Sequence, residues 1–99
     1  MAHRIVWSRT SHRDLRSLVK YISNDSPQRA EHFGYRIVAR VEMAQDHPRM
    51  GRVVPEFNQQ DLHEVIVSPY RIIYRLNEDA ALIEIIRVWH AARDTPEIQ

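Results

Sequence analysis

Three short runs rich in Val, Ile, Tyr and Trp follow one another in the C-terminal part of the chain. They cover residues 61 to 67, 70 to 76 and 81 to 89, and Ser68-Pro69 and Asn77-Glu78-Asp79 separate them. Short β-branched and aromatic runs bounded by turn residues are typical of antiparallel strands. The pattern therefore predicts a three-stranded meander, around which the rest of the chain packs.

The middle run predicts its own buried face, because successive strand residues point to opposite sides of a sheet. One side is free of charge and the other carries two arginines, so we expect helices on the first side and solvent or a ligand on the second. In the third run, apolar residues fall on both sides and the pattern assigns no core face. The uncharged side of the middle run comprises Tyr70, Ile72, Tyr74 and Leu76, and the other side Arg71, Ile73 and Arg75.

A strand and two helices are predicted before the meander. Residues 3 to 7 read as a short strand that joins the meander's sheet, since a lone strand is not stable. Apolar positions 15, 18, 19 and 22 have helical spacing. Ser8 or Ser11 caps this first helix, the latter with Asp14 as its capping-box partner, and the helix ends near residues 23 and 24.

The second helix begins at Asp25-Ser26-Pro27, where proline occupies the first helical position, and ends at His47-Pro48. The short link between the helices predicts an antiparallel hairpin. Gly34 lies inside the second helix, where glycine costs about 1 kcal/mol relative to alanine. We therefore expect a close contact at Gly34 that requires the absence of a side chain.

The order of elements predicts an α+β fold in one domain, residues 1 to 99. It consists of a short N-terminal strand, a helical hairpin and a three-stranded antiparallel meander, with residues 48 to 60 as a loop. Ninety-nine residues are enough for one modest core.

Composition narrows the classes of function. The chain has no cysteine, which excludes disulfides, thiolate metal sites and a cysteine nucleophile. The first residues lack the apolar core of a signal peptide, and no apolar run approaches the ~20 residues that span a membrane. We therefore expect a soluble, cytoplasmic protein without a membrane partner.

Metal and cofactor sites are not expected. The six histidines form neither an HxxxH pair nor an HExxH motif, and the two glycines make no phosphate-binding loop. The net charge of +1 does not by itself demand a nucleic-acid partner. The basic residues are nevertheless thirteen arginines and one lysine, and arginine suits planar contacts to phosphate and carboxylate.

Charged and imidazole side chains gather on and just beyond the meander. A carboxylate, imidazoles and arginines near one another are the groups needed to bind a phosphodiester and move a proton. The alternative is a solvated sheet face with cross-strand charge pairs, such as Glu64 with Arg71 or Arg75. The set comprises His63, Glu64, Arg71, Arg75, Arg87, His90 and Arg93.

The segments DHPRMGR (46 to 52), VPEF (54 to 57), HEVIVSPYRIIYRL (63 to 76) and IEIIRVWHAARD (83 to 94) resemble the RelE/ParE superfamily of bacterial type II toxins. The resemblance covers nearly the whole chain. It implies a small α+β toxin of an addiction or plasmid-stabilisation module, neutralised by a cognate antitoxin whose C-terminal segment wraps the toxin. It also implies that the antitoxin supplies the contact with operator DNA.

Two activities are implied by the resemblance. The RelE-like branch cleaves mRNA on the ribosome by attack of the 2′-hydroxyl on the adjacent phosphate, as an mRNA interferase. The ParE-like branch inhibits DNA gyrase. Arg71 matches the sheet arginine of the ribonucleases and Arg93 their late arginine. The candidates for the base and the acid are Glu64, His63 and His90, of which Glu64 and His90 would stand in for the glutamate and histidine that one relative uses. The lysines of the ribonucleases' first meander strand are missing here, where the chain reads Leu62-His63-Glu64-Val65.

This departure favours ParE-like gyrase inhibition. His63, Arg75 and Arg87 are then binding residues. A surface formed by the arginines and residues 90 to 99 would contact the target. The ribonuclease is the second hypothesis, and a degenerate or purely antitoxin-paired module without toxicity is the third.

Overall fold

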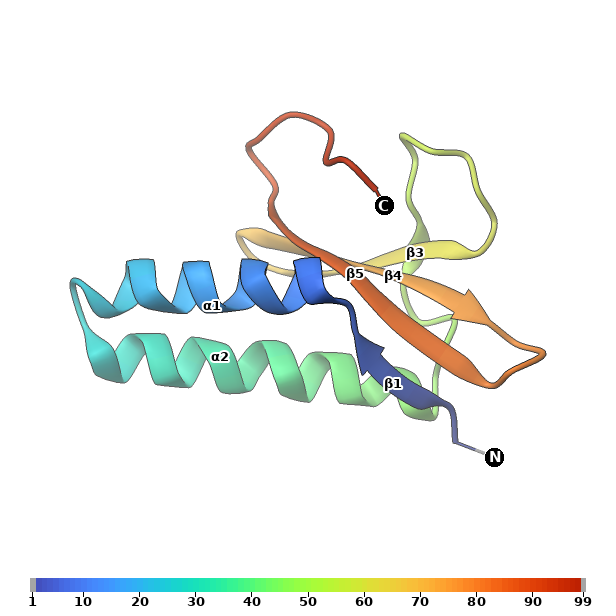
Figure 1. Ribbon diagram of the computed structural model, residues 1–99, viewed down its shortest axis with the longest axis horizontal. Helices are drawn as coiled ribbons and strands as arrows, with labels where there is room; N and C mark the ends of the chain where they lie inside the picture. The colour runs from blue at the N-terminus through green and yellow to red at the C-terminus, as the bar shows by residue number, and fades with distance from the viewer. Residues whose placement is uncertain (1, 99) are drawn as a thin grey trace.

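The computed structural model describes residues 2 to 98, which form a sheet with two antiparallel helices on one face (Figure 1). The strand order in the sheet is β1-β5-β4-β3-β2, and β1 pairs with β5 in parallel while the other neighbours are antiparallel. This arrangement confirms the α+β fold. The elements are β1 (Arg4–Trp7), α1 (Arg9–Ser23), α2 (Pro27–Glu42), the 3-10 helix η1 (Met43–Gln45), β2 (Arg52–Val53), β3 (Leu62–Val67), β4 (Tyr70–Asn77) and β5 (Leu82–His90).

Ser8, and not Ser11, caps α1. The Ser8 hydroxyl accepts a hydrogen bond from the Ser11 N–H at 3.0 Å, and Ser11 itself is buried in the first turn. The expected capping box with Asp14 is therefore wrong. The Asp14 carboxylate instead accepts a hydrogen bond at 3.0 Å from the N–H of Val88, beyond the point where β1 stops pairing with β5. The Val88 N–H has no strand partner on that edge of β5, and the Asp14 carboxylate satisfies this donor in place of one at the start of the helix.

Gly34 does not mark a close contact, contrary to the sequence expectation. A methyl group added there would lie 3.6 Å from a methyl carbon of Val19, which is an ordinary packing distance between α1 and α2. The tight position is Gly51, where an added methyl group would overlap the backbone oxygen of Glu64. Gly51 thus lets the chain pass directly against β3.

The main core lies between the helices and the uncharged side of β4, as the sequence predicts. Ile72 and Tyr74 are almost fully buried there, and the half-buried Tyr70 packs against the same cluster. Helix residues contribute Leu18, Ile37 and Val41.

A bulge in β5 explains why its core face could not be read from alternation. Tyr74 of β4 pairs with Ile85 and Ile73 pairs with Arg87, so Ile86 has no partner on β4. An extra residue in one strand shifts the alternation beyond it. Ile83, Ile85 and Val88 consequently belong to the helix-side core, although 85 and 88 are three residues apart.

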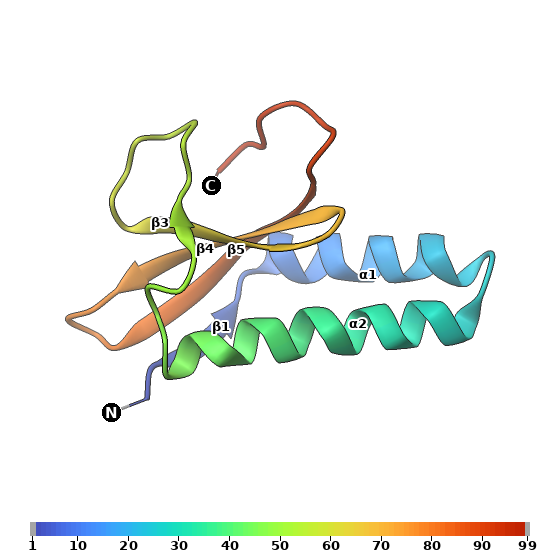
Figure 2. The same ribbon diagram turned by 180° about the vertical axis from the view of Figure 1, so that it is seen from behind.

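The side of the sheet away from the helices carries a second, smaller core, where the sequence pattern predicts solvent or a ligand. Val54, Leu62, Ile73 and Ile86 are buried there. Phe57 and Ile98 pack against them. Figure 2 shows the loop after β2 and the C-terminal segment rising on this side.

The segment 48 to 60 is not wholly a loop, because it contains β2. Arg52 and Val53 pair with Glu64 and His63 of β3. A two-residue strand has no period of its own, so only its partner defines it.

Candidate functional site

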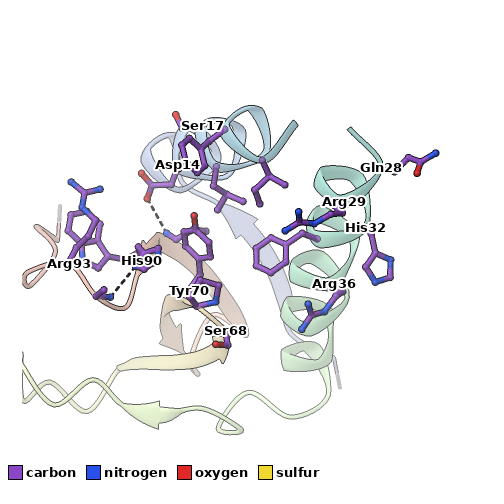
Figure 3. A pocket seen from close by; sticks show the side chains of 18 residues that line it. Asp14, Ser17, Gln28, Arg29, His32, Arg36, Ser68, Tyr70, His90 and Arg93 are labelled. Carbon is purple, nitrogen blue, oxygen red and sulfur yellow. Dashed lines mark hydrogen bonds between the residues drawn. The ribbon is translucent and has the colours of Figure 1, made fainter. Parts of the chain in front are cut away.

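A groove of about 1240 Å³ lies between the helical hairpin and the adjoining ends of β4 and β5. Figure 3 shows α2 side chains along one wall and β4 and β5 side chains opposite them, with α1 closing the groove. The short α1–α2 link and the Ser68-Pro69 turn bring these elements to the same end of the molecule.

Aromatic rings form a connected row along the groove. The Phe33 and Tyr70 ring centroids are 5.7 Å apart, and Tyr70 meets His90 edge to face at 5.2 Å. Burial, followed by the neighbouring Tyr21, raises the pKa of the Tyr70 phenol, so this hydroxyl stays neutral. The row joins α2, β4 and β5 across the groove, with rings spaced as favourable aromatic pairs.

The groove is basic. Arg29, Arg36 and Arg93 line it and form no ion pair within residues 2 to 98. The sole acidic residue among the described lining residues is Asp14, which Arg87 neutralises at 2.8 Å. The charged side chains of the groove that have no ion pair within residues 2 to 98 are therefore all cationic.

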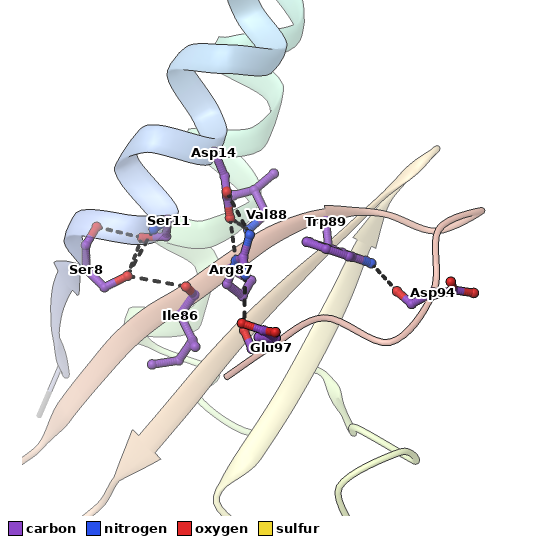
Figure 4. Close-up of polar contacts among 9 residues, drawn as sticks. All are labelled: Ser8, Ser11, Asp14, Ile86, Arg87, Val88, Trp89, Asp94 and Glu97. Atoms are coloured by element: carbon purple, nitrogen blue, oxygen red, sulfur yellow. Dashed lines mark hydrogen bonds and ion pairs between the residues drawn. The ribbon is translucent and has the colours of Figure 1, made fainter. Parts of the chain in front are cut away.

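The C-terminal segment is held to β5 by backbone acceptors. The Trp89 indole N–H donates to the carbonyl of Asp94 at 2.6 Å, and Arg87 donates to the carbonyl of Glu97 at 3.1 Å (Figure 4). The guanidinium carbons of Arg87 and Arg93 lie 4.7 and 4.5 Å from the centre of the Trp89 ring. Arg93 is thereby presented on an aromatic ring at the edge of the groove.

Four charged residues form a network on the opposite side of the sheet. Arg71 donates from Nε to Glu64 at 2.6 Å and through its two terminal nitrogens to Glu56 at 2.6 and 2.7 Å. Arg52 donates to the second oxygen of Glu64 at 2.6 Å. The Glu64 side chain is fully buried and that of Arg71 is 9% exposed. Both oxygens of Glu64 are therefore engaged by cations.

The network also sets the protonation of its members. The hydrogen bond from Arg71 lowers the pKa of Glu56, more than desolvation raises it. The hydrogen bond to Glu56, with that to Glu64 adding to it, raises the pKa of Arg71. Both groups are charged at neutral pH.

The sheet separates the residues that the sequence suggested as one constellation. Glu64 and Arg71 lie on the side away from the helices, whereas His90 packs on Tyr70 in the groove on the helix side. His63 is buried on the helix side, stacked on Tyr74 with ring centroids 5.6 Å apart. Arg75 binds Asp61 at 2.6 Å and Arg87 binds Asp14. Of the seven candidates, the structure brings His90 and Arg93 together in the groove.

Sequence reasoning did not identify Arg52 and Glu56 of the network or the residues that α1 and α2 contribute to the groove. Arg29, His32 and Arg36 follow i, i+3, i+7 spacing, a helical row that could have been recognised. Nothing in the sequence marks Arg52 and Glu56 as partners of β3 and β4.

Residues 2 to 98 contain no group of three or more His, Asp or Glu side chains placed to hold a metal ion. No helix in this range is long and apolar enough to cross a bilayer.

Comparison with known proteins identifies relatives along nearly the whole chain. The family model of the ParE toxin of the type II toxin–antitoxin system parDE matches residues 5 to 95. Y4kP, a proposed toxin of Sinorhizobium fredii, is 30% identical over 97 residues, which are 96% of this chain and 95% of the relative.

Solved structures share the fold. The chromosomal ParDE toxin–antitoxin system of P. aeruginosa matches with a TM-score of 0.73 and 20% identity, over 90% of this chain and 96% of that chain. A mutant of E. coli RelE in the free state matches with a TM-score of 0.69 and 15% identity, over 93% and 86% of the two chains. Because the family model spans residues 5 to 95, this chain belongs to the ParE toxin family of type II toxin–antitoxin systems, within the RelE/ParE superfamily.

Proposed function

We propose that this toxin arrests growth by inhibiting DNA gyrase and does not cleave RNA. The observation that carries the proposal is the position of Glu64 and His90, the two residues that would serve as base and acid. They face opposite sides of the sheet. One phosphodiester cannot contact both.

RNA cleavage by the 2′-hydroxyl needs a base for that proton, a cation for the phosphate and an acid for the leaving oxygen. Glu64 is fully buried between Arg71 and Arg52, and a carboxylate held by two cations is a poor base. Arg71, the candidate cation, already donates to two carboxylates. The network therefore stabilises the sheet and leaves Glu64 poorly suited to act as a general base.

The target-binding surface that we propose is the C-terminal segment, residues 90 to 98, together with neighbouring arginines. Residue 99, also suggested by the sequence, lies outside the described residues. Arg93 is exposed, has no ion pair within the described chain and lies on Trp89. Arg75 and Arg87 are engaged by carboxylates and His63 is buried, so Arg93 is the strongest candidate for a direct contact.

The purified toxin is expected to inhibit supercoiling by gyrase and to leave mRNA on programmed ribosomes uncut in a primer-extension assay. Arg93→Ala should weaken gyrase inhibition by about tenfold, since a single charged contact contributes about 1 to 3 kcal/mol. Arg4→Ala is the matched control, because Arg4 is also exposed but lies at the other end of the sheet. This control should inhibit as the parent does.

Cleavage of ribosome-bound mRNA that disappears in His90→Ala, with gyrase unaffected, would overturn the proposal in favour of the ribonuclease. Equal losses of gyrase inhibition in Arg93→Ala and Arg4→Ala would refute the C-terminal segment as the contact surface.

A cognate antitoxin is the second partner that we propose. β2 pairs only with residues 63 and 64 of β3, so the edge of β3 from Val65 to Val67 has no neighbouring strand within the described residues. Ile66 is 49% exposed on this edge. An open edge of this kind can accept an added strand from a partner segment that orders on binding.

Co-expression with the small reading frame next to its gene is expected to yield a complex that co-elutes on size exclusion. Ile66→Pro should weaken the complex, because proline cannot donate the backbone hydrogen bond and disturbs the edge. Ile66→Ala, which keeps the backbone donor, is the matched control. Elution of the toxin alone in every case would exclude the partner.

A further inference from the structure

The groove between the helical hairpin and the ends of β4 and β5 combines arginines that have no ion pair within residues 2 to 98 with aromatic rings, of which Tyr21 is exposed and the others are half-buried. We propose that it binds single-stranded nucleic acid. This inference concerns the groove alone and does not depend on whether gyrase is the target.

The α2 wall of the groove is positively charged. Arg29, His32 and Arg36 lie on one side of α2, and the two arginines are separated by two helical turns, roughly 10.5 Å along the axis. Both arginines are exposed and neither has an ion pair within residues 2 to 98. A row of free guanidinium groups along a groove can follow a phosphate backbone.

Aromatic rings lie beside two of the groove arginines. The guanidinium carbon of Arg36 lies 5.5 Å from the Phe33 ring centre, and Arg93 lies over Trp89. An arginine stacked on a ring keeps its N–H edge available for phosphate. Tyr21 is 73% exposed at the groove, which leaves its ring accessible to a base. Cations tracking a backbone, with rings that accept bases, are the features of single-strand binding sites.

An acidic peptide would satisfy the arginines equally well, but the connected row of Phe33, Tyr70 and His90 favours planar rings as partners. A duplex keeps its bases stacked on one another, so their faces cannot reach these rings. The chemistry therefore favours an unpaired strand.

The test measures fluorescence anisotropy of labelled oligothymidylate and oligouridylate with the full chain across a salt series. The logarithm of the binding constant is expected to fall linearly with the logarithm of the salt concentration. Arg29→Ala/Arg36→Ala should make this slope shallower by about 1.4, since each contact between an arginine and a single-strand phosphate contributes about 0.7. Arg9→Ala/Arg16→Ala is the matched control, with two exposed arginines at the same seven-residue spacing on α1, outside the groove. Its slope should equal that of the parent.

Stacking is tested separately. Tyr21→Leu should weaken binding by about fivefold or more, whereas Tyr35→Leu, which removes a ring that is 68% exposed on α2 outside the groove, should not. Thermal unfolding of each variant checks that the fold is intact. We expect unchanged unfolding temperatures, because all the substituted residues are exposed.

Three results would overturn the proposal. The parent could fail to bind either oligonucleotide at low salt. Arg9→Ala/Arg16→Ala could weaken oligonucleotide binding as much as Arg29→Ala/Arg36→Ala does, which would indicate a general attraction to positive charge and no defined site. A labelled oligoglutamate peptide could bind in an Arg29- and Arg36-dependent manner while the oligonucleotides do not, which would make the groove a peptide site.

Discussion

Arg71→Leu is expected to destabilise the protein by about 3 to 5 kcal/mol, because it removes one partner of a buried ion pair and leaves the other charged. Glu64 would keep only Arg52, whose side chain is 66% exposed. Urea unfolding measures the free energy of unfolding. Arg75→Leu is the matched control: it lies on the same strand and side of the sheet and pairs with Asp61, but both side chains are over a third exposed. Arg75→Leu should lower the free energy of unfolding by no more than about 1 kcal/mol.

The double variant Glu64→Leu/Arg71→Leu should be more stable than Arg71→Leu alone, since it removes the unpaired buried charge. The pH profile supplies a second check. The folded pKa of Glu56 lies below its ordinary 4.5, so the stability that this carboxylate contributes is present above that value and is lost as pH falls through the lowered folded pKa. The difference in free energy of unfolding between the parent and Arg71→Leu should therefore become smaller at acidic pH. Equal effects of Arg71→Leu and Arg75→Leu would contradict the buried network.

Ile72→Ala is expected to cost about 2 to 5 kcal/mol of unfolding free energy, the range for removing a large side chain from a packed core. Ile72 is fully buried in the centre of the sheet, between Val65 of β3 and Val88 of β5 and beneath the helices. The change leaves a cavity between the sheet and the helices, and the closely packed side chains around it cannot move enough to fill it.

Ile66→Ala is the matched control for this loss. It is the same substitution on the neighbouring strand, at a residue that is 49% exposed, and should change stability by about 0.5 kcal/mol or less. A similar shift in the two variants would show that the helices do not cover this side of β4.

The sequence alone determined β1, the two helices, the three strands of the meander and the buried side of the middle strand. The helical spacing of Leu15, Leu18, Val19 and Ile22 and the uncharged side of β4 are local periodic patterns, and a residue's place in such a pattern does not depend on distant partners. The family resemblance also follows from the sequence, because it rests on contiguous segments.

Tertiary structure decided everything that depends on which segments meet. The bulge at Ile86 exists only relative to β4, and β2 exists only because Arg52 and Val53 pair with β3. The second core required Phe57 and Ile98, from a loop and a terminal segment, to fold over the same side of the sheet. Irregular segments carry no period from which such burial could be read.

The candidate site shows the same division most clearly. The sequence correctly singled out charged and imidazole residues on the meander, and its alternative of cross-strand charge pairs is realised by Glu64 with Arg71. It could not reveal that Glu64 and His90 face opposite sides, because the bulge reverses alternation before His90 is reached. Nor could it reveal that Arg52 and Glu56 complete the network. Ion pairing is set by distances between side chains far apart in sequence, and only the folded sheet and its covering loop fix those distances.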